Sequence, residues 1–206
     1  MPREYLSVHT FGDTIVRYPH DPVTGRVGLE LLPASLADQA VEPRGSLRGE
    51  SFIDVLPGND PWPARPAESL LQFKLVGDPY PGAFAQGHTM RNSESLRRFT
   101  LARQRVIERV DTTVIETNLS SVDGLVATHR LSWKRGDGAF VVSSAFENGS
   151  RTPVALEMLA SFSLAGISPF HEADAPGRLK VHRFRSVWSA EGRHECRSIE
   201  ELHLER

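Results

Sequence analysis

The 206-residue sequence contains a single cysteine, Cys196, so no disulfide can form within the chain. A thiol next to His194 could act as a nucleophile. Its neighbours Glu195 and Arg197 are polar, however, and no partner residue stands at a motif spacing. The pattern therefore favours an inert thiol, and the fold must be stable without oxidation.

Long apolar runs are also absent. Nowhere do about eighteen apolar residues follow one another, and the stretch from Met1 to Thr10 has neither an apolar leader core nor a small-residue cleavage site. The formal net charge of −2 provides no basic field for a nucleic acid or an anionic membrane. We expect a cytoplasmic protein that binds neither. Arginines do gather on one segment, where mixed charge on a solvated strand is the favoured interpretation over phosphate contacts: Arg97, Arg98, Arg103, Arg105 and Arg109.

The motifs of the common catalytic mechanisms are missing too. The chain has no Gly-x-Ser-x-Gly, no phosphate loop, no His-Glu-x-x-His and no Cys-x-x-Cys. His171, Glu172 and Asp174 offer three potential metal ligands, but a solvated acidic loop fits this stretch better. His182 and His194 are typical of half-buried hydrogen-bonding residues on a sheet. We therefore predict no catalytic residue, no metal and no cofactor in this chain.

What the sequence does contain is a series of short β-type segments between turn signals. The segment from Leu125 to Trp133 alternates apolar and polar residues, and it lies between the turn signals Val122–Gly124 and Lys134–Gly138. The connections are too short for the crossovers of a parallel sheet. We therefore expect a single all-β domain over residues 1–206, a large antiparallel β-sandwich in preference to a closed barrel, with few or no helices. The expected strands are Thr14–Tyr18, Val27–Leu32, Ser51–Leu56, Leu70–Val76, Arg98–Val110, Thr112–Leu119, Leu125–Trp133, Ala139–Phe146 and Val154–Leu164.

The tryptophans stand in two kinds of context. Residues 57–66 contain four prolines, which exclude a central strand and predict a stiff surface loop that exposes Trp62. Trp133 and Trp188 stand in strand-like contexts that favour packing, and we expect Trp133 to be largely buried.

The C-terminal third places arginines and an aromatic residue together. Arg183 and Arg185 share one side of an expected strand, and Trp188, Glu191 and Arg193 follow. A planar guanidinium pairs with carboxylates in bidentate fashion and stacks on rings, which suits a structural salt-bridge network and a protein interface equally well. We expect Arg183 or Arg185 to pair with an acid such as Glu191, or with an acid of a neighbouring domain that this sequence does not contain.

The same residues carry a resemblance to a known family. Phe162–Phe170 and His182–Arg193, with Leu75–Asp78, Thr89–Ser93 and Thr112–Val114, resemble the N-terminal domain of glycoside hydrolase family 36, the bacterial α-galactosidases. The resemblance extends from about Leu70 to Leu204. It implies a large β-supersandwich, in agreement with the strand pattern.

The resemblance also implies a chemistry that lies outside this sequence. Family members hydrolyse terminal α-galactosides with retention, using two aspartates of a (β/α)₈ barrel whose carboxyl groups stand about 5–5.5 Å apart. No part of that barrel is in this sequence, which ends about where the linker to it would begin. We assign no catalytic residue and expect the chain alone to be inactive. The implied partners are its own barrel, further copies in a homo-oligomer, and an α-galactoside substrate.

One binding element of the family has a counterpart here. In the family, an N-terminal-domain loop with a Gly-Asp-Phe-Arg-x-Pro-Ala-like motif approaches a neighbouring subunit's active site. The corresponding stretch contains Asp60, Trp62 and Arg65, which the resemblance implies as substrate-binding residues, although extra prolines change the spacing. An aromatic ring covers the apolar face of a sugar, and a carboxylate accepts hydrogen bonds from its hydroxyls. The alternatives are a stand-alone carbohydrate-binding module, which needs several exposed aromatics on one sheet face, and a free-standing structural protein.

Overall fold

The computed structural model describes residues 4–39, 69–80, 83–84, 87–88, 90–164, 177–189 and 191–202. In this part of the chain, regular structure is almost entirely antiparallel β, with a short 3-10 helix η1 (Ala34–Gln39) and a single-turn helix α1 (Glu94–Arg97). The strands are β1 (Glu4–Phe11), β2 (Thr14–Asp21), β3 (Arg26–Val27), β4 (Glu30–Pro33), β5 (Phe73–Leu75), β6 (Ala83–Phe84), β7 (Gly87–His88), β8 (Thr100–Glu108), β9 (Thr112–Ser120), β10 (Leu125–Lys134), β11 (Phe140–Asn148), β12 (Leu156–Leu159), β13 (Lys180–Phe184) and β14 (His194–Ser198).

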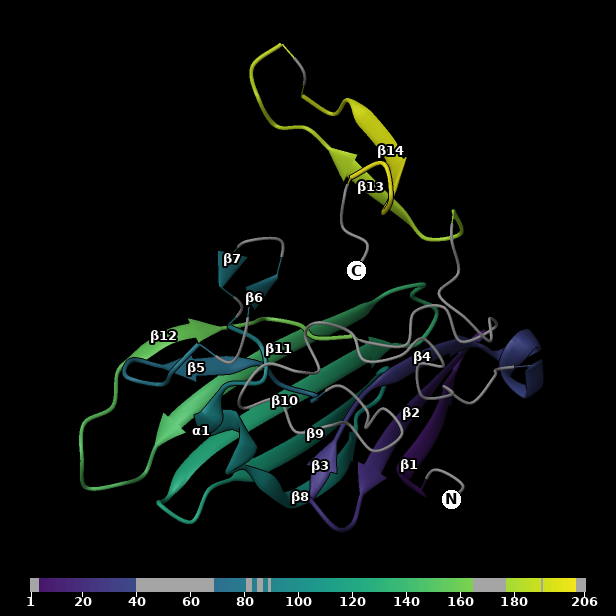
Figure 1. The fold of residues 1–206 in the computed structure, drawn as a ribbon. Coiled ribbons are helices and arrows are strands. Elements are labelled where there is room, and N and C mark those ends of the chain that lie inside the picture. Colours follow the sequence, from purple (N-terminus) through teal and green to yellow (C-terminus); the bar gives the residue numbers. More distant parts are fainter. Residues whose placement is uncertain are drawn as a thin grey trace.

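Two four-stranded sheets form the body of the domain (Figure 1). In the first, β2 pairs with β1 on one side and with β3 and β4 on the other. The second has the order β11-β10-β9-β8, so that consecutive strands are neighbours. Strands β5 and β12 form a small additional sheet beside it. The predicted all-β sandwich is confirmed. No helix among the described residues is long and apolar enough to cross a membrane.

The alternating side chains of β10 form the inner face of the second sheet. Ala127, His129 and Leu131 are fully buried, whereas Arg130 between them is exposed. Trp133, at the end of the strand, is only partly buried: its ring lies 5.2 Å from that of Phe11, and its indole N–H donates to a backbone carbonyl in the following turn. The alternation was predicted correctly, and Trp133 is largely covered, as expected, although it is not fully buried because it lies at the end of the strand.

Aromatic side chains close the core at its two ends. Phe11 contacts Phe140 at 5.9 Å between ring centroids at one end. At the other, Phe73 lies 4.8 Å from Phe99 and 5.2 Å from Phe146. These rings come from both sheets and from the segment around β5, and they belong to one continuous buried cluster. A shared core of this kind holds the sheets together as one unit.

Several expected element bounds differ from the structure. Strand β1 was not predicted, and the segment expected as a strand over 154–164 contains only the four residues of β12. Strand β2 continues past its expected end at Tyr18 and ends at Asp21, whose carboxylate accepts hydrogen bonds from the backbone of Val23 and the hydroxyl of Thr24. A proline is tolerated there because it pairs with Tyr5 at an irregularity of β1, between Tyr5 and Ser7, where the regular hydrogen bonding of the ladder is interrupted. The expected strand Ser51–Leu56 and the proline-rich loop lie outside the described residues.

The two turns that flank β10 and β11 at one end pack backbone against backbone. The amide of Gly149 donates to the carbonyl of Gly124 at 3.1 Å. A Cβ on Gly149 would stand 2.7 Å from that oxygen. Both groups belong to backbone, so neither can move without shifting a turn.

We expect Gly149→Ala to lower the free energy of unfolding by about 1–3 kcal/mol, the usual cost of forcing an atom into a packed site. Gly138→Ala is the matched control, since a Cβ there would have nothing within 4 Å. Urea denaturation of both variants gives the comparison. Equal midpoints for the two would contradict the steric argument.

Candidate docking hairpin

Strands β13 and β14 form a separate antiparallel hairpin that projects from the sandwich (Figure 1). Its tip spans residues 185–193 and is closed by two backbone hydrogen bonds, from Arg185 N to Arg193 O at 3.1 Å and from Gly192 N to Arg185 O at 2.9 Å. Because opposite residues of a hairpin point to the same side, the register gives it two chemically different faces.

The first face is an ion-pair network. The Glu195 carboxylate accepts from the Arg185 guanidinium at 2.9 Å and from that of Arg197 at 2.7 Å. The hydrogen bond from Arg185 is the main cause that holds the pKa of Glu195 below its usual range, although desolvation opposes it. The expected pairing of Arg185 with an acid is correct in kind, but the acid is Glu195 and not Glu191. The reason is that β14 runs back alongside β13 and places Glu195 opposite Arg183.

The second face carries flat rings and the thiol. His182 and His194 stack with centroids 5.1 Å apart, and Phe184 continues the stack at 5.2 Å from His194. The Nδ1 of His182 lies 2.9 Å from the Nε2 of His194, and its Nε2 lies 3.6 Å from the Cys196 sulfur. All four side chains are exposed, so the expectation of half-buried histidines is wrong. No spacing rule of the sequence places Cys196 beside His182, because the two are 14 positions apart and meet only through the register of β13 with β14.

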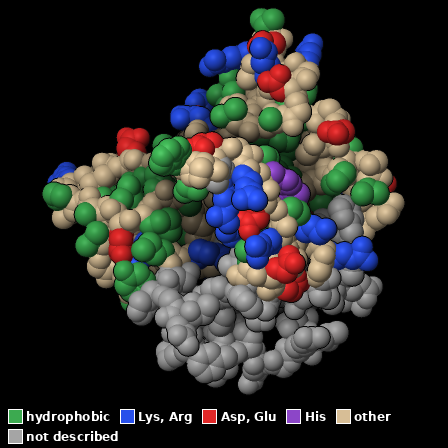
Figure 2. All heavy atoms as spheres, turned by 90° about the horizontal axis from the view of Figure 1, so that it is seen from above, with side chains coloured by type: hydrophobic (Ala, Val, Ile, Leu, Met, Phe, Trp, Pro, Cys, Tyr) green, Lys and Arg blue, Asp and Glu red, His purple; other side chains and the backbone are tan. Residues whose placement is uncertain are grey.

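The tip of the hairpin is apolar and solvent-exposed. Phe184 is 72% exposed, Val187 58% and Trp188 92%, which contradicts the packed position expected for Trp188. The space-filling view from above shows basic, acidic, histidine and hydrophobic side chains close together on this face of the molecule (Figure 2). A two-stranded hairpin is marginally stable alone in water, and aromatic residues with arginines are enriched in protein interfaces. The arrangement suits docking against a partner surface.

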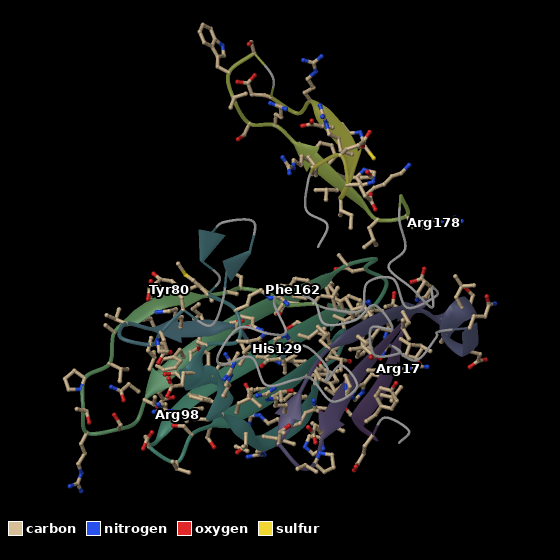
Figure 3. All side chains as sticks on the ribbon, viewed as in Figure 1. Arg17, Tyr80, Arg98, His129, Phe162 and Arg178 are labelled. Carbon is tan, nitrogen blue, oxygen red and sulfur yellow. The ribbon has the colours of Figure 1, made fainter. Side chains whose placement is uncertain are left out.

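Two arginines of the run on the sandwich, Arg98 and Arg105, form ion pairs with acids, as expected for a mixed-charge surface. Arg98 pairs with Glu94 at 2.9 Å on the exposed surface (Figure 3). Glu116 is buried beneath Arg105 and Arg130, at 2.7 and 2.6 Å. Burial raises the pKa of Glu116, but the hydrogen bonds and charges of the two arginines outweigh it and bring the pKa below its usual range. Glu116 therefore offsets much of the positive charge on this face.

Other candidate sites can be compared with the structure only in part. Asp60, Trp62 and Arg65, and the acidic set from His171 to Asp174, lie outside the described residues. Within the described ranges, no group of three or more His, Cys, Asp or Glu side chains is placed to hold a metal ion. Comparisons of the chain with protein-family models, with curated proteins and with solved structures found no match.

Proposed function

We propose that this chain is the non-catalytic N-terminal sandwich domain of an α-galactosidase-like retaining glycoside hydrolase acting on terminal α-galactosides. One observation supports the proposal above the others. The residues that carry the sequence resemblance, from His182 to Arg193, form the exposed part of the projecting hairpin. A segment of that kind is explained by a partner surface that covers it.

The chemistry of the hairpin indicates what the partner must provide. Burying Phe184 and Trp188 would contribute about 1.5–3 kcal/mol each. Arg185 is half-exposed and already pairs with Glu195, so an acidic group on the partner would extend an existing network. An apolar hollow with an acidic rim, on the following barrel or on a second subunit, meets both requirements. The domain would thus support the barrel and the oligomer, and Asp60, Trp62 and Arg65 would contribute to the rim of the substrate pocket.

The isolated chain should neither hydrolyse an aryl α-galactoside nor bind galactose or raffinose measurably by titration calorimetry. A small ligand gains affinity by burying most of its surface in a concave site, and a loop at the rim of another subunit's pocket supplies only one wall of such a site.

Joined to the barrel expected in the coding sequence after Arg206, the domain should matter to catalysis. There, Trp188→Ser should weaken the assembly seen by size-exclusion chromatography, and Trp62→Ala should lower kcat/KM without changing the stereochemical outcome.

Val122→Ser is the matched control for the assembly test, because Val122 is 98% exposed on a turn of the sandwich, away from the hairpin. Turnover by the 206-residue chain, or a downstream coding sequence without a barrel, would refute the proposal. Tight sugar binding without turnover would favour a stand-alone carbohydrate-binding module instead.

A further inference from the structure

The hairpin brings a thiol and two imidazoles together from two strands. His182 on β13 stands directly opposite Cys196 on β14, and Phe184 stands opposite His194. His182 therefore has Cys196 as its direct cross-strand neighbour and His194 as its diagonal one, and an imidazole is long enough to reach both. The two contacts use different ring nitrogens, Nε2 toward the sulfur at 3.6 Å and Nδ1 toward His194 at 2.9 Å.

This order of groups is the one that activates a nucleophile. With its proton on Nδ1, neutral His182 donates to the Nε2 of His194 and leaves its own Nε2 to accept the thiol proton. Once it has taken that proton, the ring donates to the sulfur on one side and to His194 on the other. Nucleophile, base and a third group that orients the base are thus in line. A ring stack that served packing alone would not require a ring nitrogen to point at the sulfur.

A shallow depression of about 400 Å³ lies beside the sulfur. It is lined by Cys196, Lys180, Arg197, Glu201, Ser198 and Gly177. A volume of this order accommodates a small molecule. Of the two cationic side chains, Arg197 is already paired with Glu195 on the other face of the hairpin. Lys180 lies on the same face as the thiol, where it stands opposite Ser198, and it is the cation that favours a ligand carrying negative charge.

We propose that Cys196 is a reactive thiol served by His182 as its base, and that its substrates are small disulfides bearing carboxylates. The sulfur gives its proton to Nε2 of His182 and attacks one sulfur of the disulfide. A new S–S bond forms as the old one breaks, and the departing thiolate takes the proton from His182. Cys196 is oxidised to a mixed disulfide and half of the reagent is reduced to a thiol, so atoms and electrons balance. The proposal stands independently of the function proposed above.

The test uses the 206-residue chain, in which Cys196 is the only thiol. We compare rates of reaction with 5,5′-dithiobis(2-nitrobenzoate), which carries two carboxylates, and with uncharged 4,4′-dithiodipyridine. At pH 7 the folded parent should react with the anionic reagent at least about 10-fold faster than His182→Phe, which retains a stacked ring but no base. At pH 10, where thiols ionise unaided, the two rates should converge. Lys180→Met should slow only the anionic reagent, by about threefold.

Two further measurements separate proton transfer from folding. His194→Phe keeps both His182 and the ring stack but removes the acceptor for Nδ1–H, and it should react about threefold more slowly than the parent at pH 7. Phe184→Leu is the matched control and should leave the rate unchanged. The urea-unfolded parent gives the rate of an unassisted thiol. The proposal is overturned if the folded parent reacts no faster than this unfolded reference, or if the ratio of parent to His182→Phe is the same at pH 7 and pH 10.

Discussion

Acidification from pH 6.5 to about pH 4 should lower the free energy of unfolding by about 3 kcal/mol through one side chain, His129. His129 is fully buried on the inner face of β10, within the sandwich (Figure 3). Neither of its ring nitrogens has a hydrogen-bond partner in the described part of the chain. Burial without a partner disfavours the charged ring and lowers the pKa of His129 from 6.5 to about 4.

The direction of the effect follows from which state binds the proton. Above pH 6.5 the ring is neutral in both the folded and the unfolded chain, so His129 contributes no pH dependence to the stability there. Between pH 6.5 and 4 the unfolded chain takes up a proton that the folded chain does not, so the free energy of unfolding decreases as the pH is lowered. His9, whose pKa is also lowered by burial although the charge of Glu108 opposes this, adds a smaller loss in the same direction.

Urea denaturation of the parent and of His129→Leu at pH 7 and pH 4.5 isolates the contribution. The leucine variant lacks the titrating group, so it should lose markedly less stability than the parent over this range. His20→Gln is the control, because His20 lies near the end of β2 and is partly exposed, and this variant should follow the parent. Equal losses for the parent and His129→Leu would show that the buried imidazole is not the cause.

The central strands could be predicted because their signals are local. In β10 the period-two alternation, and in β9 and β11 the β-type composition between short turns, act within a few residues, and the observed bounds agree closely with those expected. Strands β1 and β14 lack such a signal. His194–Ser198 has only Cys196 as an apolar residue, and the apolar residues of Glu4–Phe11 do not alternate with period two. Each segment becomes a strand by pairing with a partner. Pairing of that kind depends on tertiary context, which composition does not report.

The candidate sites divide in the same way. The arginines in the C-terminal third correctly indicated an ion-pair network, but partners were expected from nearness in sequence. The register of β13 with β14 instead pairs Arg185 with Glu195 and places Cys196 beside His182, 14 positions away. The spacing across the tip sets that register, and no sequence motif encodes it. Asp60, Trp62 and Arg65 remain predictions of the resemblance.

A second large effect is expected where a lysine is buried. The Lys74 side chain, on β5, is 2% exposed. Its ammonium group lies 2.5 Å from the carboxylate of Glu157 on β12 and 4.5 Å from the centroid of the Tyr80 ring. The Tyr80 hydroxyl donates to the other oxygen of the same carboxylate at 2.6 Å. The hydrogen bond from Lys74 is the main cause that holds the pKa of Glu157 below its usual range.

Removing the two partners should therefore have unequal effects. In Glu157→Gln the Lys74 ammonium stays buried without its counterion, and stranding that charge costs about 3 kcal/mol. In Lys74→Met a flexible apolar chain of similar length fills the same space, while Glu157, 27% exposed, keeps contact with water. We expect the methionine variant to lie within about 1 kcal/mol of the parent.

The double variant decides between a stranded charge and simple loss of contacts. If the cost of Glu157→Gln comes from the buried ammonium, adding Lys74→Met should restore most of the lost stability, and urea midpoints would show this directly. Glu94→Gln is the matched control: it breaks the pair with Arg98, in which both side chains are about half-exposed, and should change stability by less than about 0.5 kcal/mol. Additive losses in the double variant would contradict the argument. They would mean that each side chain stabilises the junction of β5 and β12 by its own packing rather than through the pair.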